Sequence, residues 1–392
     1  MPPPVLFRDA RIIDPEAGAE IRGELLVAER MIAGISPAGH GGLAVPADTR
    51  VIDCGGRVLG PGLIDVGAFR ADVAAAIAGG VSTVLLMPDQ SPPLDDPALI
   101  ERAERLGKPR LWVRPLAAAT RGMNGRELAD IGLMKEAGAV GVATGREAIA
   151  DAAVMLRLLR YAAGLGLVTI VHPEDPCLTA GAVATEAEYA SRLGLAAAPA
   201  AAEAIQIARD LRLAEEAGAA LHFATVTTAE GAALIAAARA RGQDVTAATT
   251  PEAFLLNETA LGGYRSYARL SPPLRTEDDR QAIRAAIGAG TIDIIASRHD
   301  PRDQESKRRP FAEAAPGAAG QAILSTMALT LVHDGVVGLA RLFRLLALRP
   351  AQRFGLPGGR LALGAPADLL LLDPDVAWVV DSDTLPGLAG NT

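Results

Sequence analysis

One pattern repeats along most of this sequence and restricts the folds that the chain can adopt. After residue 59, short and continuously apolar runs such as STVLLMP, LVTIVHPED and DIIASRH alternate with stretches rich in Ala, Leu, Arg and Glu. Strands buried on both faces have continuous apolar runs rather than an alternation of apolar and polar residues. About eight such strand–helix units over roughly 290 residues are typical of a (β/α)8 barrel. We therefore predict an α/β fold with a TIM-type barrel over residues 59–355.

The two ends of the chain have a different pattern. Segments near the start, VLFRDARIID and ELLVAERMIAGIS, are short and are broken by Asp, Gly and Pro, and the segment RLALGAPADLLLLDPDVAWVVD near the end returns to this pattern. Such segments predict antiparallel strands with tight turns. We expect residues 1–58 and 356–392 to build one small β-sandwich domain beside the barrel.

Composition excludes several classes of protein. Aromatic residues are 3% of the chain and hydrophobic residues 50%, so the core must consist of Ala, Leu, Val and Ile. A net charge of −8 argues against a nucleic acid or a membrane surface as partner. Cys54 and Cys177 lie far apart, which argues against a disulfide framework and favours a reducing compartment. The sequence begins without an export signal and has no membrane-length apolar run, so a cytoplasmic location is expected.

Several long segments resemble the dihydroorotases of the amidohydrolase superfamily. PGLID (61–65) is similar to the start of their first barrel strand, and further similar segments are TRGMNGRELADIGLMKEAGAV (120–140), HPED (172–175), EAIQIARD (203–210), SPPLRTEDDR (271–280), PFAEAAPGAAG (310–320) and RPAQRFGL…GRLALGAPADLLLLDP (349–374). The resemblance implies an amidohydrolase-type barrel with a β-sandwich and, in active members, a zinc centre at its mouth. Zinc there makes hydroxide from bound water and polarises the amide carbonyl, while a carboxylate moves the proton.

The resemblance also shows that residues of this zinc centre have been lost. Active members end the first strand in H-x-H, and the corresponding positions here are Gly67 and Phe69. The fourth strand should present a bridging carboxylate or a carbamylated lysine, where this chain has Thr144. In the sixth strand, the ligand histidine is replaced by Thr225. None of these four side chains is expected to hold zinc.

The eighth strand departs furthest from the family pattern. Family members read D-H-A-P-H, with the aspartate as metal ligand and proton shuttle, whereas this chain reads RHDPR from Arg298 to Arg302. An arginine is always protonated, cannot act as a base and repels a divalent cation. Only His172, after the fifth strand, keeps a ligand position, and a zinc site needs three or four protein ligands. We expect no catalytic residues, no intact metal site and no cofactor.

The remaining polar residues allow two interpretations. His172 is best explained as a strand-end histidine bonded to Glu174 or Asp175. The other residues form an anion-binding pocket if they converge at the mouth, or each pairs with a nearby acid; they are Arg70, Arg146, Arg298, His299 and Arg302.

This chain matches the family over its length but lacks the expected metal ligands. In this respect it resembles the noncatalytic dihydroorotase-like proteins that associate with aspartate transcarbamoylase and help to assemble or stabilise it. We therefore predict a pseudoenzyme of pyrimidine biosynthesis with aspartate transcarbamoylase as its partner. Because barrels of this family commonly dimerise, a homodimer is a further expectation. One alternative is an active dihydroorotase, or another cyclic amidohydrolase, whose zinc is bound from unexpected positions. Another is a small-anion sensor. An active enzyme should contain metal, and the melting temperature of a sensor should rise when an anion is added. A structural protein without its partner should show neither property.

Overall fold

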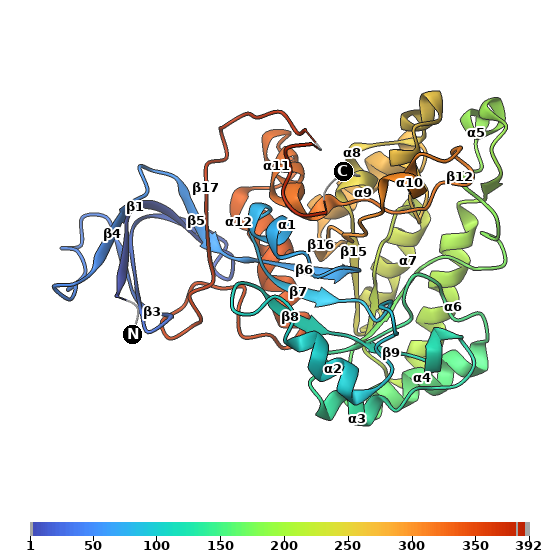
Figure 1. The fold of residues 1–392 in the computed structure, drawn as a ribbon, viewed down its shortest axis with the longest axis horizontal. Helices are drawn as coiled ribbons and strands as arrows, with labels where there is room; N and C mark the ends of the chain where they lie inside the picture. Colours follow the sequence, from blue (N-terminus) through green and yellow to red (C-terminus); the bar gives the residue numbers. More distant parts are fainter. Residues whose placement is uncertain (1–2, 382, 389–392) are drawn as a thin grey trace.

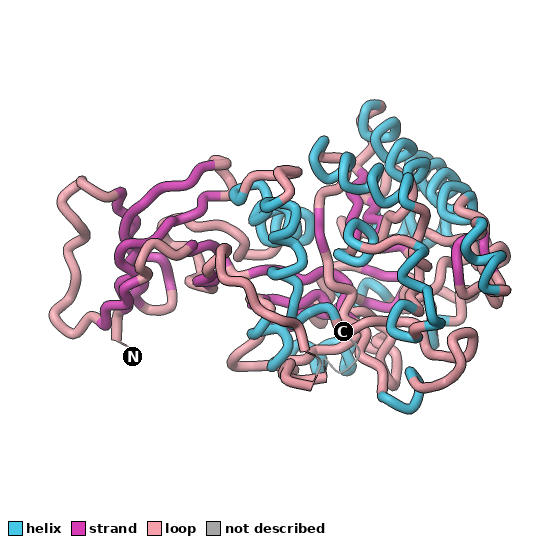
Figure 2. Tube along the Cα trace, turned by 90° about the horizontal axis from the view of Figure 1, so that it is seen from above, coloured by secondary structure: helices cyan, strands magenta, loops and turns pink. Residues whose placement is uncertain are grey.

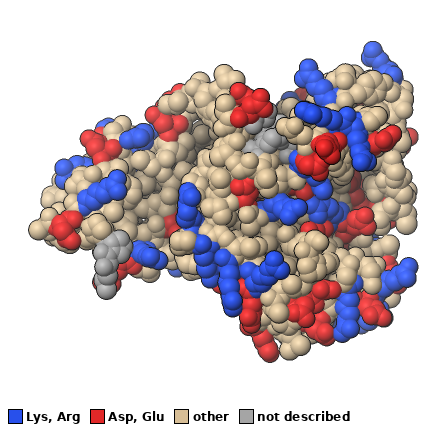
Figure 3. Space-filling view, in the orientation of Figure 1, with Lys and Arg blue, Asp and Glu red and all other residues tan. Residues whose placement is uncertain are grey.

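The computed structural model describes residues 3–381 and 383–388, with a small sheet at one end and a larger body of strands and helices beside it (Figure 1). The N-terminus lies at the small sheet, and the helices gather in the larger body (Figure 2). Lysine and arginine side chains are interspersed with aspartate and glutamate over the visible face (Figure 3). That face therefore has no extended region of a single charge.

Parallel strands follow one another through the body in the order of the sequence. One sheet contains β6 (Leu63–Ala68), β7 (Val81–Leu86) and β8 (Trp112–Pro115), and a second contains β9 (Ala117–Ala118), β10 (Val142–Ala143), β11 (Thr169–Val171), β14 (Leu221–Phe223), β15 (Val245–Thr249) and β16 (Ile294–Ile295). Only Leu116 separates β8 from β9, so the two sheets share one extended segment. At the other edge, the Phe69 N–H donates to the His299 carbonyl at 2.9 Å, which joins the end of β6 to the segment after β16.

A helix lies between each strand segment and the next, and helices cover the periphery of the body (Figure 1). In chain order these helices are α1 (Val73–Ala78), α2 (Pro97–Glu104), α3 (Ile131–Glu136), α4 (Ala152–Gly164), α6 (Ala201–Ala217), α7 (Ala229–Ala240), α9 (Glu277–Ala289) and α11 (Leu324–His333). The Asp72 carboxylate begins α1 by accepting the N–H groups of Ala74 and Ala75, and Gly218, at φ 61°, ends α6 in the left-handed region that favours glycine. The predicted α/β alternation is thus confirmed. No helix in the described part of the chain is long and apolar enough to cross a membrane.

Both faces of the central strands are buried, as the continuous apolar runs predict. In β7, Val84 and Leu86 belong to the large cluster that also contains residues of the helices. The intervening Leu85, together with Met87 just after β7, belongs to a second cluster with Ile64 of β6. Successive side chains of a strand point to opposite faces, so the first cluster lies between strands and helices and the second on the inner side of the strands.

The small sheet is built from both ends of the chain. Its strand order is β17-β5-β1-β2-β3, with β4 beside β1. The strands are β1 (Val5–Asp14), β2 (Ala19–Ala28), β3 (Met31–Pro37), β4 (Arg50–Asp53), β5 (Val58–Pro61) and β17 (Leu369–Leu372). The two-layered sandwich and the domain boundaries remain predictions, and residues 1–2, 382 and 389–392 of the predicted small domain lie outside the described residues.

The expectation of antiparallel strands needs one correction. Strands β1, β2 and β3 pair in antiparallel fashion, and so do β5 and β17. Strands β4 and β5, however, run parallel to β1. The reason is the long connection over residues 38–49, which carries the chain back to the start of β1 before β4 begins. A parallel pair needs such a crossover, whereas a tight turn joins antiparallel strands.

After β17 the chain leaves the small sheet and returns to the body (Figure 1). The His333 Nε2 atom donates to the Pro374 carbonyl at 3.1 Å, and Leu385 packs beside Ala75 of α1. The Leu388 N–H then donates to Asp72 Oδ2 at 2.6 Å. The last described residues therefore lie against the start of α1, close to the strand ends.

Candidate functional site

The positions compared above with metal ligands lie at the ends of the parallel strands, and all are buried: Gly67, Phe69, Thr144, His172, Thr225 and Arg298. Phe69, Thr225 and Arg298 line a pocket of about 220 Å³, which we call the strand-end pocket. His172 lines a neighbouring pocket of about 390 Å³ instead. Six positions far apart in sequence therefore lie at the strand ends, and four of them line one or the other of these two cavities.

An aromatic ring and two guanidinium groups occupy the strand-end region. Phe69 is 3% exposed, and the Arg146 and Arg298 Cζ atoms lie 3.9 and 5.0 Å from the centroid of its ring. A guanidinium at such distances from an aromatic face is held by a cation–π interaction. Gly67 has no side chain, and a Cβ built there would lie 3.6 Å from Met87 Sδ. Neither Gly67 nor Phe69 offers a lone pair to a metal ion.

His172 bonds to the first of the two acids named from the sequence. Its Nε2 atom lies 3.4 Å from Glu174 Oε2, and its backbone N–H donates to Thr144 Oγ1 at 3.2 Å. Asp175 instead accepts backbone N–H groups from Cys177 and Leu178. The Nδ1 atom of His172 has no partner among the described residues. The ring is thus fixed by a carboxylate on one side only.

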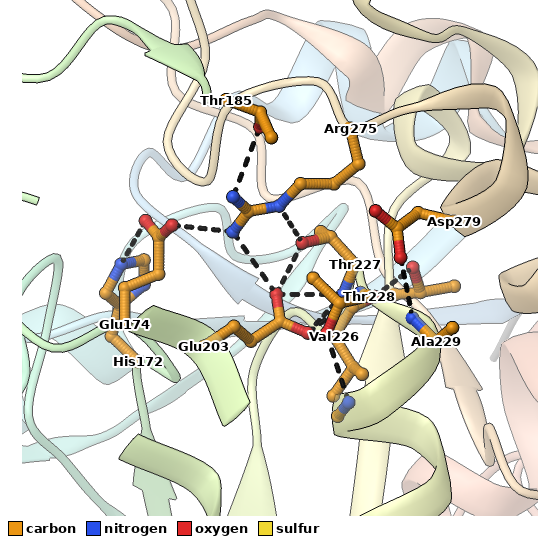
Figure 4. A network of polar contacts seen from close by, with 12 residues as sticks. His172, Glu174, Thr185, Glu203, Val226, Thr227, Thr228, Ala229, Arg275 and Asp279 are labelled. Atoms are coloured by element: carbon orange, nitrogen blue, oxygen red, sulfur yellow. Dashed lines mark hydrogen bonds and ion pairs between the residues drawn. The ribbon is translucent and has the colours of Figure 1, made fainter. Parts of the chain in front are cut away.

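Arg275, which the sequence analysis did not identify as a site residue, holds that carboxylate in place (Figure 4). Its Nη2 atom donates to Glu174 Oε1 at 2.7 Å, and both side chains are buried. Burial acts to raise the pKa of Glu174, but the His172 bond and the Arg275 charge outweigh it and leave this pKa below its usual range. Glu174 is therefore an ionised carboxylate that is already neutralised by an arginine.

Glu203, at the start of α6, completes the same network. Its carboxylate accepts the backbone N–H and the hydroxyl of both Thr227 and Thr228, and it lies 3.5 Å from Arg275 Nη2. The Nε atom of Arg275 donates to Thr227 Oγ1 at 2.9 Å. Figure 4 shows these side chains converging from separate elements. Glu203 thereby fixes the segment after β14, and every contact made by its carboxylate is internal to the fold.

Arg298 is the residue that the resemblance equates with the family's aspartate. Its backbone has φ 44°, in the left-handed region that costs a non-glycine residue about 1–2 kcal/mol. Its Nη1 atom has no hydrogen-bond partner among the described residues. Burial lowers the pKa of Arg298 to about 10, against the charges of Asp89 and Asp300, which raise it. The side chain therefore remains a cation at neutral pH.

Two further arginines of the strand-end pocket, Arg146 and Arg302, share one acid. Asp300 accepts from Arg146 Nη2 at 2.6 Å and Nε at 3.1 Å, and from Arg302 Nη2 at 2.7 Å. Asp89 Oδ1 also accepts the Arg146 backbone N–H at 3.0 Å, and burial raises the pKa of Asp89. Of the predicted anion-binding set, Arg146 and Arg302 thus meet at the pocket with Arg298 but are paired with acids.

The structure does not bring the other two members of that set into the pocket. Arg70 is exposed and does not line the pocket. His299 is fully buried behind it: its Nδ1 atom accepts the Gln321 N–H at 3.4 Å, and its Nε2 atom lies 3.8 Å from Asp72 Oδ2. Asp65, a further buried acid, accepts from the Ser297 N–H at 2.8 Å and joins β6 to the segment after β16.

The residues present do not fit a zinc ion. No group of three or more His, Cys, Asp or Glu side chains that could hold a metal occurs in the described ranges, 3–381 and 383–388. At the strand ends, one nitrogen of His172 faces Glu174, and Glu174 is neutralised by Arg275. Arg298 adds a buried positive charge to the same region. A divalent cation would meet repulsion there rather than three or four ligands.

Known proteins resemble this chain along nearly its whole length. A model of the dihydro-orotase-like family matches residues 56–231. A dihydroorotase of Geobacter sp. strain M21 is 35% identical over 402 aligned positions, which cover 99% of this chain and 94% of the relative. A dihydroorotase-like protein of Pseudomonas aeruginosa is 36% identical over 388 positions, 94% of this chain and 90% of the relative.

Solved structures of related enzymes share the fold. The L-hydantoinase (dihydropyrimidinase) from Arthrobacter aurescens superposes with a TM-score of 0.85 at 25% identity and covers 98% of this chain and 90% of its own. The dihydropyrimidinase from Brevibacillus agri has a TM-score of 0.81 at 21% identity and covers 97% of this chain and 88% of its own. The α/β fold is therefore of the hydantoinase-like amidohydrolase kind.

Proposed function

The chain belongs to the dihydroorotase family, and from that premise we propose that it serves pyrimidine biosynthesis without catalysing the dihydroorotase reaction. The observation that carries the proposal is the buried Arg298 cation, at the position of the family's metal-binding and proton-shuttling aspartate. Hydrolysis of a cyclic amide needs an activated water and a group that accepts its proton. With a pKa of about 10, Arg298 does not accept a proton at neutral pH.

Two neighbouring acids, Glu174 and Asp300, are poor replacements for the missing base. Glu174 is bound by Arg275 at 2.7 Å, and Asp300 is bound by both Arg146 and Arg302. A carboxylate that is paired with a guanidinium is a weaker proton acceptor, because the pairing stabilises its ionised form. We propose that these pairs are structural and that they stabilise the strand ends in place of a metal centre.

The same proposal includes the architecture predicted from the sequence. We take the two parallel sheets as one closed (β/α)8 barrel, supported by the segment 112–118 that they share and by the bond from Phe69 to His299. We take the small sheet as the family's β-sandwich domain, supported by the contribution of both chain ends.

We propose aspartate transcarbamoylase as the structural partner, on the resemblance to noncatalytic dihydroorotase-like subunits, and a reducing cytoplasm as the compartment. Cys54 is buried and Cys177 exposed, and both are free thiols, which agrees with a reducing compartment. The test is affinity capture of the tagged chain from its native cell, followed by mass spectrometry. Recovery of the transcarbamoylase in stoichiometric amount supports the partnership. Recovery of the chain alone, or as a homodimer alone, contradicts it.

A second candidate is an active dihydroorotase or another hydrolase of cyclic amides. It is favoured by relatives that carry the name dihydroorotase and align with 99% of this chain. This candidate requires zinc to be bound from positions other than the six strand-end residues. Dihydroorotate formation and hydrolysis should be assayed with added zinc, beside a catalytic relative as positive control. Turnover comparable to that of the relative would establish the second candidate and exclude the first.

A further inference from the structure

The strand-end pocket is lined by both polar and apolar side chains. Its volume is about 220 Å³, and a water molecule occupies about 30 Å³ of liquid, so the pocket has room for a small organic molecule. The apolar lining includes Pro272, Pro273 and Leu274. The polar lining includes Arg298 and Thr225. The lining therefore suits a ligand with one polar end and one apolar end.

The charges around this pocket leave one cation without a bonded acid. Arg146 and Arg302 are bonded to Asp300, and Arg275 is bonded to Glu174. The charges of Asp89 and Asp300 act on Arg298 and raise its pKa. Its Nη1 atom, however, has no hydrogen-bond acceptor among the described residues. A buried charged donor without an acceptor is unfavourable, so a ligand that supplies an acceptor is stabilised there.

A second donor in the lining of the pocket also lacks a partner. Thr225 is 2% exposed, and its Oγ1 atom has no hydrogen-bond partner in the part of the chain that the structure describes. It follows β14, whereas Arg298 follows β16, so the two side chains reach the pocket from separate strands. Glu252 also lines the pocket, and burial raises the pKa of its carboxyl, which weakens its repulsion of an anion.

We propose that the strand-end pocket binds a small organic monocarboxylate, with its carboxylate on Arg298 and Thr225 and its apolar part against Pro272, Pro273 and Leu274. One unpaired guanidinium matches one negative charge. The acids Asp300 and Glu147 also line the pocket, and they disfavour a second negative charge on the ligand. This binding site goes beyond the proposed function and does not depend on the transcarbamoylase.

Asp89 offers the competing arrangement. Its Oδ2 atom is buried and also has no hydrogen-bond partner among the described residues. A direct ion pair between Asp89 and Arg298 would neutralise the guanidinium and so compete with an anionic ligand. Replacing Asp89 by Asn removes this competing charge and keeps an oxygen that can accept the Arg146 N–H. The Asp89→Asn variant is therefore expected to raise the affinity for the carboxylate, whereas loss of the Arg298 charge should lower it.

The experiment is titration calorimetry with benzoate on the full chain, with the melting temperature followed in parallel. We expect saturable binding by the wild-type chain, binding weaker by about tenfold or more in Arg298→Gln, and tighter binding in Asp89→Asn. Arg70→Gln, which changes an exposed arginine outside the pocket, should bind as the wild type does. Thr225→Val should weaken binding less than Arg298→Gln does.

Three outcomes would overturn the proposal: absence of benzoate binding to the wild-type and Asp89→Asn chains, equal binding by Arg298→Gln, or preferential binding of inorganic phosphate. The result is separable from the proposed function. Turnover of dihydroorotate would contradict the proposed function alone, while loss of benzoate binding in Arg298→Gln would still support this site.

Discussion

The Arg298 guanidinium lies 5.0 Å from the centre of the Phe69 ring, and both side chains are buried at the ends of adjacent strand segments. The two segments are joined directly by the Phe69 N–H, which donates to the His299 carbonyl. A cation and an aromatic face thus lie at two positions that the family resemblance equates with metal ligands, one in each segment. The face of the ring offsets part of the cost of burying the arginine, whose Nη1 atom still has no hydrogen-bond partner among the described residues.

Replacing Phe69 by Ala should destabilise the chain by about 3–5 kcal/mol, because it removes a buried ring and leaves a cavity. Arg146 and Arg298 also lose their cation–π contacts with the ring, which lowers the free energy of unfolding further. Urea unfolding measures the free energy. Phe69→Leu is the matched control and should cost clearly less, since it keeps most of the buried volume. Equal stability of the Ala variant and the wild type would show that the ring is not a packing element.

Replacing Arg275 by Met should destabilise the chain by about 3–5 kcal/mol, because it leaves the buried Glu174 and Glu203 carboxylates without their counter-charge. The control is Arg160→Met, which breaks an exposed pair with Glu216 and should cost less than about 1 kcal/mol. Unfolding midpoints of the two variants give the comparison. Similar losses in both would contradict a structural role for the network in Figure 4.

Asp72 should make stability depend on acid pH. The carboxyl is mostly buried, which acts to raise its pKa, but His299 and the backbone N–H groups of Leu388 and Ala75 lower that pKa from 3.8 to about 2. A carboxyl with a lower pKa in the folded chain stabilises fully above its unfolded pKa and loses this contribution as pH falls through the folded pKa. About 2 kcal/mol should therefore be lost between about pH 4 and pH 2.

The Asp72→Asn variant should lose less stability than the wild type over this pH range, as measured by urea unfolding at several pH values. Asparagine still caps α1, so the helix itself is retained. The exposed Asp48→Asn variant is the control and should follow the wild-type profile. An Asp72→Asn profile as steep as that of the wild type would show that this carboxyl does not carry the acid dependence.

Much of the fold was predictable because it depends on local sequence patterns. Continuous apolar runs located the strands, and the similarity between the two chain ends predicted that both would build the small sheet. The parallel placement of β4 and β5 was not predictable, since nothing in a short alternating segment specifies which side of β1 it pairs with. Strand direction there depends on the path of the loop over residues 38–49.

The candidate site was predictable in its positions but not in its pairings. Phe69 and Arg298 line the strand-end pocket, whereas the residues that follow them, Arg70 and His299, do not. All four residues follow the ends of β6 and β16, so the alternation of strand side chains could not predict which of them face the pocket. The bond from Arg146 to Asp300 joins side chains 154 positions apart in the sequence. The periodicity of a sequence gives no information about contacts over such a separation. The importance of Arg275 was missed for the same reason.

The central claim is that this member of the dihydroorotase family has no metal centre and no dihydroorotase activity. The most direct measurement is elemental analysis of the chain purified without chelators, with dihydroorotate turnover assayed on the same sample. The account predicts zinc far below one ion per chain and no turnover above the blank. Stoichiometric zinc together with turnover would contradict it, and would mean that ligands come from residues outside the strand-end positions.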